Sequence, residues 1–179
     1  PTFVMSGVTA IAGGYYFSLI LVGSDLYSFG HNSLGQLGLG DTTHRNTPTF
    51  VRGSVTAISC GGHHSLILEG SDLYSSGYNY HGQLGLGDNI SRNTLTLVMG
   101  GVTAIGSGYN DSLILVGSDL YGTGENSEGQ LGLGDNTNRN TPVLVMGGVT
   151  AIAGGDSHTL ILEGSDLYGT GYNYWGQLG

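Results

Sequence analysis

The chain is poor in positive charge. Its 179 residues contain four arginines and no lysine against thirteen acidic residues, so the formal net charge is −9. Nucleic acids and anionic membranes are bound mainly through clustered lysine and arginine side chains. The sequence has no such cluster, and we therefore expect neither a nucleic-acid partner nor a membrane partner.

Cysteine and long apolar runs are equally scarce. Cys60 is the single cysteine, which excludes an intramolecular disulfide and a metal site built from several thiolates. The longest apolar run, residues 19–22, is far too short to span a bilayer. No signal peptide opens the sequence, and one cysteine fits a cytoplasmic protein, but these features leave the compartment unknown.

Glycine is abundant, and its positions recur at a fixed interval. The motif VTAI begins at Val8, Val55, Val102 and Val149. The motifs GSDLY and GQLG recur with the same 47-residue spacing, starting from Gly23 and Gly35. We therefore divide this single repeat domain into repeats at about residues 1–47, 48–94, 95–141 and 142–179.

Each repeat has the pattern of short β-strands. Residues 8–11 are rich in β-branched side chains, and residues 18–21 form the continuous apolar run of a strand covered on both faces. A Gly-Ser-Asp turn then leads into residues 26–27. Residues 1–4 and 48–51 each begin with proline, which suits an outer edge strand. We predict an all-β chain, a β-propeller of four antiparallel four-stranded blades without helices.

Several motifs at once resemble the regulator of chromosome condensation repeat family. In the second repeat they are GGHHSLIL at residues 61–68, DLY at 72–74 and GYNYHGQLG at 77–85. The phrase SGVTAIAGG at residues 6–14 is also similar to the β-lactamase inhibitory propeller. The resemblance covers all four repeats. It implies a blade of four strands in a propeller that usually has seven blades, and it makes His64 and His158 structural residues between blades.

Two groups of positions vary between otherwise similar repeats. Tyrosine, histidine, aspartate and tryptophan dominate them, and these are typical recognition residues. Equivalent loops on a rigid ring emerge on the same side, so we predict a binding surface there. The candidate residues are Tyr15, Tyr16, His63, His64, Tyr109 and Asp156 after the first strand, with Tyr78, Tyr80, His81, Tyr172, Tyr174 and Trp175 after the third. Neutral drift after duplication is the alternative explanation.

Other polar positions stay fixed. Asn32 and the glutamine of GQLG recur in every repeat, and we interpret them as turn-forming residues that hydrogen-bond the backbone. Arg45 recurs beside Asp41, which predicts an ion pair within a loop.

No catalytic signature is present. The sequence has no GxSxG, P-loop or HExxH motif. His63, His64, Asp111 and His158 are metal-ligand types, but equivalent positions on neighbouring blades lie too far apart to converge on one ion except near the axis. We therefore predict a protein that is not an enzyme and that needs no metal, nucleotide or covalent cofactor.

These observations favour a non-enzymatic propeller scaffold that binds a protein of unknown identity. The alternatives are a guanine-nucleotide exchange factor, an enzyme inhibitor, or an engineered or recently amplified repeat without an evolved partner. The strict period leaves no room for the insertion that nucleotide exchange requires. Because terminal blades would expose apolar faces, we also predict that two copies close an eight-bladed ring. A fragment of a longer propeller and a closed four-bladed ring are the rival interpretations.

Overall fold

The computed structural model describes residues 2–179, and these residues form fifteen β-strands and no helix. The first sheet, blade 1, contains β1 (Val8–Gly13), β2 (Phe17–Val22), β3 (Asp25–Gly30) and β4 (Arg45–Arg52). Blade 2 contains β5 (Val55–Cys60), β6 (His64–Glu69), β7 (Asp72–Gly77) and β8 (Arg92–Met99). Blade 3 contains β9 (Ala104–Ser107), β10 (Asp111–Val116), β11 (Asp119–Gly124) and β12 (Arg139–Met146). Blade 4 contains β13 (Val149–Gly154), β14 (His158–Glu163) and β15 (Asp166–Gly171).

Every blade is an antiparallel meander in chain order. The second and third strands are joined by a two-residue turn, in which Val22 pairs with Asp25. Gly23, the first turn residue, has a φ of 61°, which glycine adopts without steric cost. The all-β prediction is confirmed, and the sheets match propeller blades. Within residues 2–179, no helix is long and apolar enough to cross a membrane.

The outer strand of a blade comes from the sequence that precedes the next blade. The predicted strand at residues 48–51 lies within β4, but β4 pairs with β3 and so completes blade 1. The 47-residue repeat and the blade are therefore offset. The predicted strand at residues 1–4 is wrong for residues 2–4, which form no strand, and Pro1 lies outside the described residues.

Blade 4 differs from the prediction, because it has three strands rather than four. Gly179 occupies the repeat position of Gly38, which precedes β4 in blade 1. Within residues 2–179, no strand pairs with the outer edge of β15.

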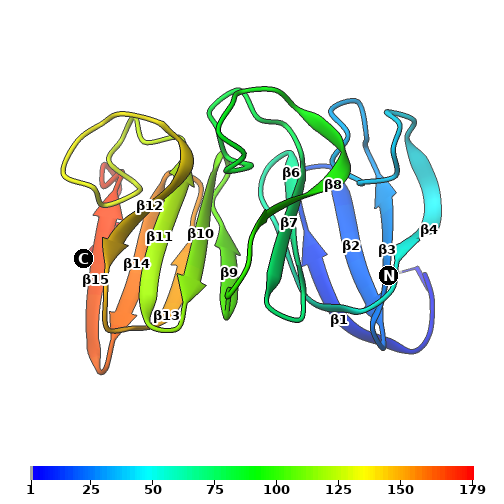
Figure 1. Cartoon of the computed structure of the whole chain (residues 1–179), viewed down its shortest axis with the longest axis horizontal. Coiled ribbons are helices and arrows are strands. Elements are labelled where there is room, and N and C mark those ends of the chain that lie inside the picture. The colour runs from blue at the N-terminus through cyan, green and yellow to red at the C-terminus, as the bar shows by residue number, and fades with distance from the viewer. Residues whose placement is uncertain (1) are drawn as a thin grey trace.

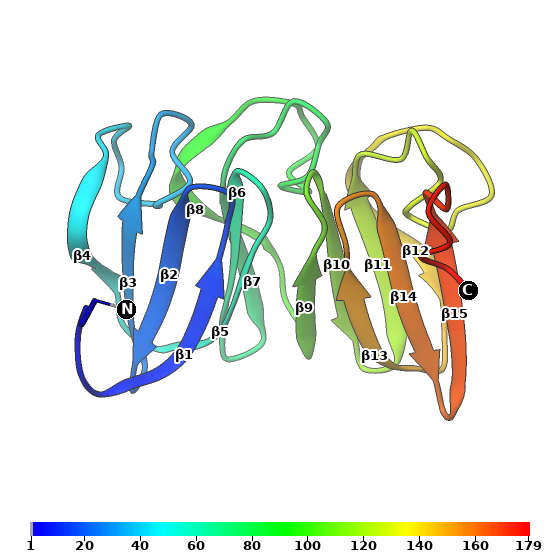
Figure 2. The same cartoon turned by 180° about the vertical axis from the view of Figure 1, so that it is seen from behind.

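The blades stand side by side in a row, with blade 1 and blade 4 at opposite ends (Figures 1 and 2). Their first strands, β1, β5, β9 and β13, contact one another in sequence. The apolar core lies between blades: Leu19 and Leu26 of blade 1 share a cluster with Val55 and Ile67 of blade 2. Burial of hydrocarbon between neighbouring blades therefore holds the array together.

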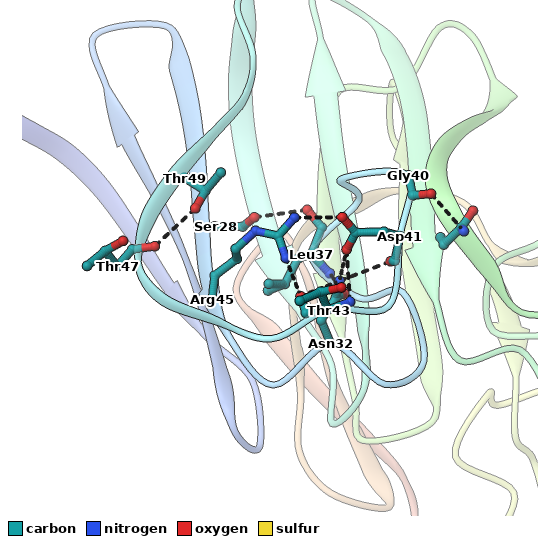
Figure 3. Close-up of polar contacts among 10 residues, drawn as sticks. Ser28, Asn32, Leu37, Gly40, Asp41, Thr43, Arg45, Thr47 and Thr49 are labelled. Carbon is teal, nitrogen blue, oxygen red and sulfur yellow. Dashed lines mark hydrogen bonds and ion pairs between the residues drawn. The ribbon is translucent and has the colours of Figure 1, made fainter.

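A buried asparagine organises the long loop between the third and fourth strands (Figure 3). The Oδ1 of Asn32 accepts the N–H of Leu37 at 2.9 Å, and its Nδ2 donates to the main-chain oxygens of Asp41 and Thr43 at 3.0 and 3.1 Å. The guanidinium of Arg45 pairs with Asp41 at 2.6 Å. Asn79 and Asn126 make the equivalent bonds, which confirms the interpretation of this position as a turn-forming residue.

Candidate binding surface

The two groups of variable loops lie on one side of the row of blades, along the upper edge in Figures 1 and 2. In blade 1, Phe17 at the start of β2 pairs with Gly30 at the end of β3, so both loops leave the sheet at the same end. The N–H of His31 donates to the carbonyl oxygen of Tyr16 at 2.9 Å. Equivalent bonds join Tyr78 to His63, Glu125 to Asn110 and Tyr172 to Ser157. We call this side the loop face.

Five rings from three blades form one aromatic cluster on the loop face: Tyr15, Tyr16, His31, His63 and Tyr109. The ring of Tyr15 is central, with centroids 4.3 Å from Tyr16 and 5.7 Å from Tyr109. His63 lies 5.6 Å from Tyr15 and 6.1 Å from His31. Most of these pairs are tilted or edge-to-face, the arrangements that aromatic rings prefer.

The aromatic cluster nevertheless reaches solvent. Tyr15 is 55% exposed and Tyr16 is 64% exposed, while His63 and Tyr109 are partly exposed. A contiguous group of exposed rings is uncommon on a protein without a partner, because burying aromatic surface is favourable.

Main-chain hydrogen bonds fix the loops of neighbouring blades against each other. The N–H of Tyr15 donates to Gly62, the N–H of Gly62 donates to Tyr109, and the N–H of Tyr109 donates to Asp156, at 3.0, 2.8 and 3.2 Å. A Cβ atom on Gly62 would lie 2.6 Å from the ring of Tyr109, so this close approach requires glycine. The aromatic cluster is thus held in place before any ligand arrives.

Beside the aromatic cluster, the loop face is hollowed by a cavity of about 770 Å³. The loops after β1, β5, β9 and β13 all contribute to its lining. Tyr15 and Tyr109 lie in this lining together with the carboxylates of Glu125 and Asp156. Asn110 donates to Glu125 through Nδ2 at 3.0 Å and so orients one of these carboxylates. The hollow therefore combines aromatic rings with negative charge.

Two smaller aromatic groups lie farther out on the loops after the third strands. In blade 2, Tyr78 and Tyr80 stack at 6.3 Å, and His81 packs against Tyr80 at 5.4 Å. In blade 4, Tyr174 meets Trp175 edge-to-face at 4.7 Å. Tyr80, Tyr174 and Trp175 are exposed, and Tyr78, His81 and Tyr172 are partly exposed.

His64 is the candidate that the structure does not place on the loop face. Its side chain is fully buried between blades 2 and 3, where Nε2 lies 2.9 Å from the hydroxyl oxygen of Ser112. Burial lowers the pKa of His64 to about 4, so the ring is neutral at pH 7. The sequence places a histidine here, but its strand position alone does not reveal which side of the sheet it faces. From this position His64 cannot contact a partner.

Three further residues belong to this region although they were not among the predicted binding residues: His31, His44 and Glu125. His44 stacks on His31 at 4.8 Å, and its Nδ1 accepts the N–H of Asn32 at 2.9 Å. In blade 2 the equivalent N–H of Asn79 donates to the hydroxyl of Ser91, and in blade 3 the N–H of Asn126 donates to Oδ1 of Asn138. The repeat position of His44 is thus occupied by a hydrogen-bond acceptor in blades 1, 2 and 3. This shared property is the sequence signal that could have identified His44.

All four arginines are neutralised by carboxylates of the chain itself. The ion pairs join Arg45 to Asp41, Arg52 to Glu69, Arg92 to Asp88 and Arg139 to Asp135. The remaining nine of the thirteen acidic residues have no arginine partner within residues 2–179. The field around the chain is therefore negative.

The described part of the chain, residues 2–179, contains no group of three or more histidine, cysteine, aspartate or glutamate residues that could hold a metal ion. Burial raises the pKa of the Cys60 thiol to about 12, so the thiol is protonated at pH 7.

Comparisons with known proteins agree with this architecture. The family model described as the regulator of chromosome condensation (RCC1) repeat matches residues 24–68 and 118–162, and a second RCC1 repeat model matches residues 55–83. No curated protein sequence matches the chain.

Among solved structures, human WBSCR16 is 26% identical, with a TM-score of 0.82 over 93% of this chain and 47% of that one. Prp20p from Saccharomyces cerevisiae is 20% identical, with a TM-score of 0.85 over 99% of this chain and 48% of that one. The same yeast protein bound to Kap60 gives 21% identity and a TM-score of 0.83, over 97% of this chain and 45% of that one. The chain thus spans about half the length of these structures. Because the repeat models match half of its residues and its blades superpose on those propellers, the chain belongs to the RCC1 repeat family.

Proposed function

We propose that this chain is a non-enzymatic protein-binding module, and that it binds through the loop face. The observation that carries the proposal is the aromatic cluster, in which rings from three blades meet at positions that vary between repeats. Fixed positions build the blade, whereas these variable positions are solvent-reachable and held by interblade hydrogen bonds. Such a preorganised surface loses little conformational entropy on binding.

The charge of the site narrows the class of partner. The faces of tyrosine rings attract cations, and Glu125 and Asp156 line the same hollow. No arginine is free to form an ion pair with an acidic partner, because each one is paired within the chain. The partner that fits is a protein segment rich in arginine or lysine. The solved Prp20p structure is described with binding properties to Gsp1p and histones, which supports a protein as the partner class.

The test is calorimetric titration of the 179-residue chain with a short arginine–glycine peptide. A peptide of the same length with glutamine in place of arginine is the control ligand. The arginine peptide should bind more tightly, and Tyr15→Ala and Tyr109→Ala should each weaken its binding about tenfold. Added salt should weaken binding of the arginine peptide to the wild-type chain, because salt screens the attraction between the peptide and the carboxylates.

Phe50→Ala is the matched control variant, because Phe50 is an exposed aromatic residue on the outer strand β4 rather than on the loop face. It should leave binding unchanged. Equal affinity for the two peptides would refute a cationic partner. Unchanged binding by both tyrosine variants would refute the aromatic cluster as the site.

A further inference from the structure

We infer that His31 and His44 form an acid-sensitive switch beside the aromatic cluster, which holds the loop face in its binding form near neutral pH and releases it in mild acid. Both imidazole rings accept hydrogen bonds from buried donors, and the two rings stack on each other. The effect on a cationic partner rests on the proposed function, whereas the effect on the loop itself does not.

A buried main-chain donor determines which nitrogen of His44 carries the hydrogen. The N–H of Asn32 points at Nδ1 of His44 at 2.9 Å, and Asn32 is fully buried. Because a main-chain N–H can only donate, Nδ1 accepts through its free lone pair and the ring hydrogen lies on Nε2. A protonated imidazole carries a hydrogen on both nitrogens. Uptake of a proton by His44 therefore breaks this contact and leaves a buried N–H without an acceptor.

The amide of Gln36 fixes His31 in the same form. Oε1 of Gln36 accepts the N–H of Leu34 at 3.1 Å, which leaves the amide nitrogen facing Nδ1 of His31 at 2.9 Å. Nδ1 of His31 is therefore an acceptor as well, and its Nε2–H donates to the hydroxyl of Ser33 at 2.9 Å. Gln36 is fully buried. Uptake of a proton by His31 consequently leaves a second buried donor without its acceptor.

Charge on one ring also opposes charge on its neighbours. His44 stacks on His31 with ring centroids 4.8 Å apart, and His63 lies 6.1 Å from His31. Positive charges at such distances repel each other. Burial, followed by the charge of His31, lowers the pKa of His63. Within residues 2–179, no ion pair joins any of these histidines to a carboxylate. The stack is therefore stable only while its rings are neutral.

The other charged groups around the stack are already paired or lie in the adjoining hollow. On the same loop, Asp41 is paired with Arg45. The loop packs on β8, where Arg92 is paired with Asp88. The neighbouring loops contribute phenols, which are uncharged in mild acid, and two carboxylates of the hollow: Tyr15, Tyr16, Tyr109, Glu125 and Asp156. None of these groups forms an ion pair with the stack, so mild acid adds positive charge here.

Other blades close the same loop without a histidine. The equivalent N–H donates to the hydroxyl of Ser91 in blade 2 and to Oδ1 of Asn138 in blade 3. Neither oxygen takes up a proton between about pH 5 and 8, whereas histidine does. Among blades 1–3, only blade 1 therefore has an acid-sensitive loop closure, and blade 1 also supplies Tyr15 and Tyr16 to the aromatic cluster.

The stack is connected directly to the aromatic cluster. The N–H of His31 donates to the carbonyl oxygen of Tyr16 at 2.9 Å, and the two rings meet edge-to-face at 6.4 Å. Release of the His31 ring removes this support from Tyr16. The added positive charge also repels an arginine-rich segment that approaches the loop face. Mild acid should thus weaken binding both by disordering the cluster and by changing its charge.

The first experiment uses no partner. Nuclear magnetic resonance of the chain with nitrogen-labelled histidines should show unprotonated Nδ1 atoms in His31 and His44 at pH 7.5. Hydrogen exchange then measures the protection factor of the Asn32 amide, which should fall at least about tenfold between pH 7.5 and pH 5.5 relative to that of the Asn126 amide. His44→Asn, which introduces the residue of blade 3, should abolish this fall. A hydrogen on Nδ1 at pH 7.5, or equal behaviour of the two amides, overturns the switch.

The second experiment titrates the arginine–glycine peptide into the chain at both pH values. Wild-type affinity should be about tenfold lower at pH 5.5 than at pH 7.5. His31→Tyr/His44→Asn carries the residues that other blades have at these positions, and its affinity should be equal at the two pH values. The control variant His81→Phe should keep the wild-type ratio. The same pH dependence in the wild type and the double variant overturns the switch. No peptide binding at pH 7.5 refutes the proposed function instead, and the exchange of the Asn32 amide then decides the switch alone.

Discussion

The Nε2 atom of His64 lies 2.9 Å from the hydroxyl oxygen of Ser112, and this contact joins blade 2 to blade 3 in the buried interior. At the next junction the equivalent residues are Asp111 and Thr159. Both carboxylate oxygens of Asp111 and the hydroxyl of Thr159 are buried without a hydrogen-bond partner among the described residues. At the junction of blades 2 and 3, only Nδ1 of His64 among the corresponding side-chain atoms is buried without a partner. Unpaired buried polar groups destabilise a fold, so the two junctions should differ in strength.

Asp111→His should stabilise the chain, because it reproduces between blades 3 and 4 the histidine–hydroxyl contact that is found between blades 2 and 3. We expect the free energy of unfolding to rise by about 1–2 kcal/mol. Denaturant titration measures it. Thr159→Val in the same background is the control, and the double-mutant cycle should assign most of the gain to the new pair. An equal gain with and without the Thr159 hydroxyl would contradict this explanation.

Asp111→Asn should stabilise the chain at pH 7 and not near pH 3. Burial, followed by the nearby charge of Glu125, raises the pKa of Asp111 well above its usual value. A carboxyl whose folded pKa is raised favours folding at pH values below its unfolded pKa. This contribution is lost as the pH rises through the folded pKa. Unfolding curves of the two proteins from pH 3 to pH 7 should therefore diverge with rising pH, and parallel curves would exclude an ionising Asp111.

His64→Phe should make stability less sensitive to acid. Phenylalanine already occupies this repeat position in blade 1, as Phe17. Because burial lowers the folded pKa of His64 to about 4, the unfolded state binds a proton first as the pH falls below about 6.5. Wild-type stability should fall by up to about 3 kcal/mol between pH 7 and pH 4 from this residue alone. His64→Phe should not show this part of the acid-induced loss of stability. The control variant His81→Phe, on the loop face, should lose as much stability as the wild type.

Asn79→Ala should destabilise blade 2 by about 3 kcal/mol, because it leaves the N–H of Leu84 and the carbonyls of Asp88 and Ile90 without their partner. Thermal unfolding followed by circular dichroism measures the effect. Asn89→Ala removes an exposed loop hydrogen bond to Tyr80 and should cost less than about 1 kcal/mol. Similar losses of stability in both variants would contradict the explanation that the buried hydrogen bonds of Asn79 stabilise the blade.

The 47-residue period, the apolar runs and the turn residues predict the first three strands of each blade, since these signals are local properties of the sequence. Pairing is not local. Nothing in residues 48–51 indicates that they pair with the strand before them, so the sequence could not reveal that blade and repeat are offset. The loop face was predicted from variable residues, but the contact of Tyr15 with Tyr109 joins blade 1 to blade 3 and depends on the spacing of blades. His64 was assigned to two roles, and only its orientation within β6 shows that it is buried.

The offset between repeat and blade has an evolutionary consequence. The second, third and fourth units of 47 residues each begin within an outer strand that belongs to the blade before it. Duplication or deletion of whole units therefore preserves this arrangement. The array still has an unpaired outer-strand segment at its N-terminal side and a blade without its outer strand at its C-terminal side. Gene rearrangements can therefore change the number of blades without changing which strand completes each internal blade.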